Sequence, residues 1–73
     1  MKVEAIGFIG GGRITQIFLH ALFRNEDFNK KIVVSDLDLK CLEIIEQKFH
    51  RVKITTQNSD AAQQDLVFIA LHP

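Results

Sequence analysis

The sequence predicts an α/β fold in which helices cover both faces of a parallel sheet, and two observations support this prediction. Short apolar or β-branched runs alternate with amphipathic stretches, in the order βαβαβ(α)β. The first run, residues 3–10, is apolar almost throughout, as expected of a strand buried on both faces. Right-handed crossovers then predict the strand order 3-2-1-4, which is the first half of a doubly wound parallel sheet.

The first strand is expected over residues 3–10 and the first helix over residues 13–24. Apolar residues recur in this helix at spacings of three and four, so they share one face that we expect to be buried. These residues are Ile14, Ile17, Phe18, Ala21 and Leu22. A polar loop over residues 25–31 then leads to a second short strand, residues 32–35.

A second helix is expected after Asp38, which is a plausible N-cap. Its expected buried face carries Leu39, Leu42, Ile45 and Phe49. Beyond it, the β-branched residues 52–56 predict a third strand, residues 58–64 a short helix or turn, and residues 66–71 a strongly apolar fourth strand.

Composition excludes several classes of function. The chain of 73 residues carries 9 Lys and Arg against 9 Asp and Glu, and a balanced charge argues against a nucleic-acid partner. The single cysteine, Cys41, excludes an internal disulfide framework. The apolar runs are too short to span a bilayer, so we expect a cytoplasmic protein without a membrane partner. No set of His or Cys residues has metal-ligand spacing, and no metal site is expected.

A glycine-rich stretch lies between the first expected strand and the first expected helix. It reads Gly10-x-Gly12-x-x-Thr15 and follows Gly7 in the strand. In a dinucleotide-binding fingerprint the first glycine permits a tight turn, and the second lets a pyrophosphate approach the backbone at the start of a helix. Thr15 stands where the pattern has Gly or Ala, so the helix either shifts off the strand or places the hydroxyl against a carbonyl. The alternative interpretation is a flexible turn without a ligand.

Asp36 follows the second expected strand, about two dozen residues after Gly12, near the position of a ribose-binding acid. A carboxylate there favours NAD, whereas the hydroxyl of Ser35 and the cations Arg13 and Lys40 favour the 2′-phosphate of NADP. Asp36 could instead be a loop carboxylate or part of the cap of the next helix. Both cofactors therefore remain open on these residues.

Four stretches of the chain resemble the N-terminal domain of pyrroline-5-carboxylate reductases, which has a Rossmann-like fold. They are IGFIGGGRI at residues 6–14, VVSD at 33–36, TTQNSDAA at 55–62 and DLVFIALHP at 65–73. The resemblance implies an oxidoreductase that transfers hydride from NADPH, with NADH as the alternative, to 1-pyrroline-5-carboxylate, giving proline. The first motif is shared with the reductases that pass hydride between a deazaflavin and NADP, which are one alternative. A nucleotide-sensing regulatory module is another.

The resemblance also implies the residues that contact the cofactor. The pyrophosphate would lie against the loop after the first strand, the adenosine against residues that follow the second and third strands, and the nicotinamide beside the end of the fourth. The corresponding residues are Ile9, Gly10, Gly11, Gly12, Arg13 and Ile14 for the pyrophosphate, Ser35, Asp36 and Asn58 for the adenosine, and Ala70, Leu71 and His72 for the nicotinamide. No catalytic residue is assigned.

We expect residues 1–73 to form the first part of a dinucleotide-binding domain, with the domain for substrate and oligomerisation lying outside this chain. The parent protein would bind a small-molecule substrate and form a homo-oligomer, whereas the 73 residues alone would catalyse nothing. The fourth strand would lie at the edge of the sheet with its apolar faces only partly covered. Such an edge invites pairing with another chain.

Overall fold

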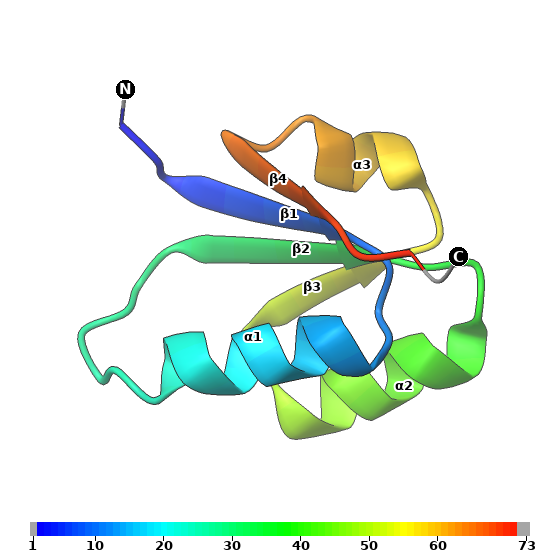
Figure 1. The fold of residues 1–73 in the computed structure, drawn as a ribbon, viewed down its shortest axis with the longest axis horizontal. Coiled ribbons are helices and arrows are strands. Elements are labelled where there is room, and N and C mark those ends of the chain that lie inside the picture. Colours follow the sequence, from blue (N-terminus) through cyan, green and yellow to red (C-terminus); the bar gives the residue numbers. More distant parts are fainter. Residues whose placement is uncertain (1, 72–73) are drawn as a thin grey trace.

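The computed structural model describes residues 2–71, which form a four-stranded sheet with three helices (Figure 1). The strands are β1 (Ala5–Ile9), β2 (Lys31–Ser35), β3 (Val52–Thr55) and β4 (Leu66–Ile69). All neighbouring strands pair in parallel, in the order β3-β2-β1-β4. The predicted fold class, element order and strand order are therefore confirmed.

The helices lie on both faces of the sheet. α1 (Arg13–Phe23) and α2 (Leu39–Lys48) cover one face, and the short helix α3 (Asn58–Ala62) covers the other (Figure 1). α3 approaches β1 closely at Gly7, where an added Cβ would lie 2.0 Å from the carbonyl oxygen of Ala61. Only glycine at this position allows the helix to approach the strand so closely.

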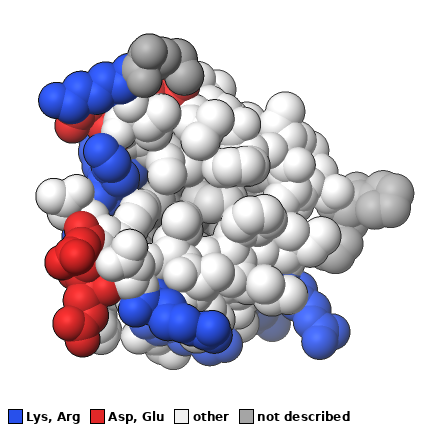
Figure 2. Space-filling view, turned by 60° about the vertical axis from the view of Figure 1, so that its left-hand side comes forward, with Lys and Arg blue, Asp and Glu red and all other residues white. Residues whose placement is uncertain are grey.

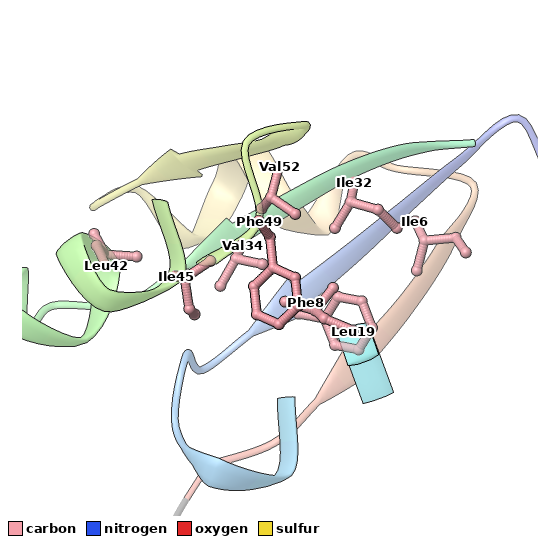
Figure 3. Packing of buried hydrophobic residues seen from close by; sticks show 9 residues of the cluster. All are labelled: Ile6, Phe8, Leu19, Ile32, Val34, Leu42, Ile45, Phe49 and Val52. Carbon is pink, nitrogen blue, oxygen red and sulfur yellow. The ribbon is translucent and has the colours of Figure 1, made fainter. Parts of the chain in front are cut away.

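The hydrophobic core lies between the sheet and the pair α1 and α2. Phe8 of β1, Val34 of β2, Leu19 of α1 and Ile45 of α2 are fully buried there. Figure 3 shows the nine residues of this cluster converging from the sheet and both helices. The sheet thus has its main core on the α1 and α2 side, while α3 packs against the other side through Ala61.

The predicted buried face of α1 is wrong. The helix buries Thr15 and Leu19, whereas Ile14, Ile17 and Phe18 are 56%, 59% and 44% exposed. Ala21 is also exposed, and Leu22 is only partly buried. The apolar spacing identified the helix, but the connection from β1 determines its rotation. Thr15 is turned toward the strand, where its hydroxyl donates a hydrogen bond to the Gly10 carbonyl. Ile14 and Ile17 are therefore exposed, and Phe18 is half-buried at the margin of the core.

The prediction for α2 is largely confirmed. Asp38 is the N-cap, and its carboxylate accepts a hydrogen bond of 2.9 Å from the Lys40 N–H. Leu42 and Ile45 are buried, but Leu39 is 62% exposed, which corrects its predicted place in the buried face. Leu39 is the first residue of the helix and is exposed at its N-terminal end.

The described part of the chain contains no helix that is long and apolar enough to cross a membrane.

Candidate dinucleotide-binding site

The loop between β1 and α1 lies at the carboxyl edge of the sheet, and Gly10 makes its sharp turn. Gly10 has a φ of 110°, a conformation that residues with a side chain rarely adopt. Its N–H donates a hydrogen bond of 2.7 Å to the Ser35 carbonyl at the end of β2. An added Cβ would lie 2.4 Å from the Ala70 carbonyl oxygen. This turn therefore lies between the end of β2 and the residue that follows β4.

Gly11 connects the loop to Asp36. The Gly11 N–H donates a hydrogen bond of 2.7 Å to Oδ2 of Asp36, and the Asp38 N–H donates one of 2.8 Å to Oδ1. The Asp36 carboxylate thus bridges the glycine loop and the residue that caps α2. Both of its oxygens accept backbone hydrogen bonds. This contact with the glycine loop was not predicted, because nothing in the local sequence around Asp36 indicates it.

Gly12 is the N-cap of α1, with extended backbone angles (φ −78°, ψ −160°). No side chain of the described residues caps this end of the helix, and its first turn contains no acidic residue. The first backbone N–H groups of α1 therefore remain available to an anion, which the helix dipole also favours. The exposed Arg13 adds a positive charge at the same position.

Thr15 fixes α1 against the loop. It is fully buried, and its hydroxyl donates a short hydrogen bond to the carbonyl of Gly10, which is also buried. Of the two arrangements that the sequence left open, the hydroxyl against a carbonyl is the one observed. The threonine therefore replaces a small residue without leaving its polar atom unsatisfied.

Replacing Thr15 with valine keeps the volume but leaves the buried Gly10 carbonyl without its donor. We expect the free energy of unfolding to fall by about 1–3 kcal/mol. Urea denaturation measures this loss. The control is Thr56→Val at an exposed position just beyond β3, which we expect to change stability by less than ~0.5 kcal/mol. Equal effects of the two substitutions would contradict this role for the Thr15 hydroxyl.

Ser35 and Asn58 meet beside the loop. The Ser35 side chain is fully buried, and its hydroxyl donates a hydrogen bond of 2.9 Å to Oδ1 of Asn58, the first residue of α3. Asn58 itself is exposed. The structure thus brings two of the predicted adenosine residues together and leaves Asn58 as the one whose side chain faces solvent.

The end of β4 lies along the same loop. The Ala70 N–H donates a hydrogen bond of 2.8 Å to the Ile9 carbonyl, and Leu71 is exposed. These two predicted nicotinamide residues are therefore next to the glycine turn. The third, His72, lies outside the described residues. The roles of these residues toward a cofactor stay predictions.

Two other side chains near the site have no catalytic geometry. Burial and the neighbouring Asp38 carboxylate raise the pKa of the Cys41 thiol, so it is protonated at neutral pH. Asp38 itself is occupied as the cap of α2. Within residues 2–71, no group of three or more His, Cys, Asp or Glu side chains could hold a metal ion.

The sheet order, the crossover helices and the glycine turn at the carboxyl ends of the strands define a Rossmann-like α/β protein. Residues 5–73 match the model of a family described as NADP oxidoreductase, coenzyme F420-dependent, and the chain belongs to this family. The match supports an NAD(P)-binding domain of an oxidoreductase. No curated protein matches the chain.

Proposed function

We propose that the chain is the NADP(H)-binding part of an oxidoreductase that reduces 1-pyrroline-5-carboxylate to proline. The observation that carries the binding proposal is the uncapped start of α1 directly behind the glycine turn. Its unpaired N–H groups and the positive end of the helix dipole suit a pyrophosphate. Membership in a family of NADP oxidoreductases supports the same cofactor. The substrate is proposed from the resemblance to pyrroline-5-carboxylate reductases.

In this proposal the residues of the chain bind and orient the cofactor, which supplies the hydride when bound. The backbone from Ile9 to Ile14 holds the pyrophosphate. Asp36, Asn58 and the supporting Ser35 hold the adenosine half, and Ala70 to His72 flank the nicotinamide half. Those of these groups that lie within residues 2–71 are at the carboxyl edge of the sheet, where open α/β sheets bind their ligands.

We propose NADP rather than NAD. The family is one of NADP oxidoreductases, and the exposed cations Arg13 and Lys40 lie on the first turns of α1 and α2. The Asp36 carboxylate opposes a 2′-phosphate by charge. The same carboxylate also accepts two backbone hydrogen bonds, and the one from the Gly11 N–H holds the glycine loop in place.

The variant Asp36→Asn distinguishes the charge repulsion between Asp36 and a 2′-phosphate from the contribution of Asp36 to the glycine loop. We expect it to shift the ratio of NADPH to NADH affinity about fivefold toward NADPH, because one repulsive charge near the phosphate is worth ~1 kcal/mol at a solvated site. Loosening of the loop affects both cofactors and cancels in the ratio. Titrations of both nucleotides, followed by amide chemical shifts, measure it. The control Asp27→Asn, in the loop before β2, should leave the ratio unchanged. An unchanged ratio in Asp36→Asn would remove Asp36 from the ribose pocket.

The activity is tested by following NADPH oxidation with 1-pyrroline-5-carboxylate. We expect the 73 residues to bind NADPH weakly and to catalyse nothing, whereas a longer protein that also contains the substrate domain forms proline. Robust turnover by the 73 residues would overturn this division. The family description favours a deazaflavin as a second candidate reaction partner. Hydride exchange between NADP and the deazaflavin, without proline formation, would support that candidate instead.

A further inference from the structure

We propose that the chain has a second ligand site, a small pocket that binds a phosphate monoester with an apolar body. The pocket lies at the amino edge of the sheet, where α1 and α2 end and β3 begins. We call it the basic pocket, and its lining residues are Phe23, Lys48, Phe49, His50 and Arg51. This inference goes beyond the proposed function and does not depend on nucleotide binding.

The basic pocket is separate from the glycine loop. Phe23 is the last residue of α1, which has 11 residues, so the pocket lies about 15 Å from the start of that helix. The other lining residues lie between the last residue of α2 and the first residue of β3. Because both helices run back from the carboxyl edge, the pocket and the glycine loop lie at opposite edges of the sheet (Figure 1).

The size and the aromatic wall of the basic pocket suit a ligand with a single ring. Its volume is about 280 Å³, close to the lower limit of ~300 Å³ for small-molecule sites. Phe49 belongs to the hydrophobic core, and its ring stacks on Phe23 with 5.9 Å between ring centroids. The two rings therefore form an apolar wall that the core holds in place.

Arg51 lies against this aromatic wall. Its guanidinium carbon is 5.4 Å from the centre of the Phe23 ring, which is a cation–π contact. A guanidinium carries five N–H donors in a planar arrangement that matches the oxygens of a phosphate. Contact with the ring restricts the side chain before a ligand binds, so less conformational entropy is lost on binding.

The positive charge around the basic pocket exceeds the charge that the helix ends neutralise. Lys48 is the last residue of α2, and Arg24 is the C-cap of α1. Basic residues at such positions offset the negative ends of helix dipoles, which is the alternative role of these two. Two helix ends supply roughly one negative charge together, whereas Arg24, Lys48 and Arg51 carry three positive charges. About two positive charges remain, which matches a phosphate dianion.

The basic pocket has no acidic counterpart among its lining residues. Within residues 2–71 the only ion pair joins Lys2 to Glu4, so no carboxylate neutralises Lys48 or Arg51. The Lys48 ammonium donates one hydrogen bond of 3.3 Å to Oε1 of Gln16 and retains its other donors. On the face shown in Figure 2, Lys and Arg lie along the lower margin and Asp and Glu gather at the left margin. The charge of the pocket is therefore available to an anion.

Titration of the whole chain with phenyl phosphate, followed by backbone amide shifts, tests the proposal. We expect a dissociation constant on the order of 1 mM for so small a ligand, with shifts at residues 23–24 and 48–51. Inorganic phosphate, which lacks the ring, should bind at least ~5-fold more weakly, because it buries no apolar surface. Benzyl alcohol, which has the ring without the charge, should leave these amides unchanged.

Arg51→Gln should raise the dissociation constant of phenyl phosphate ~10-fold, because a charged hydrogen-bond donor is lost. Lys48→Gln should raise it ~3-fold, since it removes a single exposed charge. The matched control is Lys53→Gln, which removes the same charge at an exposed position of β3 outside the pocket. It should leave the constant within ~2-fold. The shifts at the pocket should also persist in Gly12→Val, which blocks the glycine loop.

Circular dichroism of each variant shows whether it remains folded, and the two exposed pocket residues Arg51 and Lys48 serve as independent checks. The proposal would be overturned if the pocket amides did not shift at ~10 mM phenyl phosphate, tenfold above the expected constant. Shifts confined to residues 10–14 would also overturn it, because they would place the anion on the glycine loop alone. Equal effects of Arg51→Gln and Lys53→Gln, or equal affinities for phosphate and phenyl phosphate, would do the same.

Discussion

Replacing Gly7 with alanine is expected to destabilise the protein by about 3 kcal/mol or more. The new methyl carbon would lie 2.0 Å from the Ala61 carbonyl oxygen and 2.8 Å from its carbonyl carbon. These are backbone atoms of α3, which cannot turn aside as a flexible side chain would. A folded chain of 73 residues buries only about 60% of its unfolded surface and has little stability to lose. A large fraction of the variant should therefore be unfolded without denaturant.

Urea denaturation followed by circular dichroism measures this effect. The matched control is Gly12→Ala, the same substitution at a residue whose φ of −78° suits any side chain; it should cost less than ~1 kcal/mol. If Gly7→Ala were as stable as the control, α3 would not pack on β1 as described. Retained stability with loss of the α3 amide signals alone would show that α3 detaches as a separate unit.

Replacing Gly12 with valine is expected to abolish nucleotide binding while leaving the fold intact. Gly12 is extended at the start of α1, so valine fits the backbone and costs about 1 kcal/mol as a poorer N-cap. Its branched side chain, however, would occupy the place where the pyrophosphate approaches the backbone. We expect the affinity for NADPH to fall by ~100-fold, which corresponds to about 3 kcal/mol.

This loss is measured by titrating NADPH and following the backbone amide shifts of residues 10–14, which respond even to weak binding. Ala21→Val, an exposed substitution near the other end of α1, is the control and should bind as the unmodified chain does. Unchanged affinity in Gly12→Val would place the pyrophosphate elsewhere than on this loop. Loss of binding in both variants would indicate a general effect on α1 instead.

The residues of the candidate site divide into those that sequence could locate and those that it could not. The glycine turn was predictable, because a strand, closely spaced glycines and a helix follow one another within a few residues. Asp36 was predicted at the tip of β2, but its hydrogen bond to the Gly11 N–H joins residues 25 positions apart. The burial of Ser35 against Asn58 likewise depends on how α3 lies over the sheet.

The sequence by itself determined the order of the elements, the cap at Asp38 and the strand order. These depend on local patterns and on the right-handed crossover, which all compact α/β chains share. Only the tertiary structure decided which face of α1 is buried. The apolar spacing predicted that the face with Ile14, Ile17 and Phe18 is buried. In the structure, the short connection from β1 and the hydrogen bond from Thr15 to Gly10 turn the face with Thr15 and Leu19 toward the core instead. α1 has 11 residues and does not twist along its length. The rotation that the Thr15 hydrogen bond sets at its first turn therefore determines which face is buried along the whole helix.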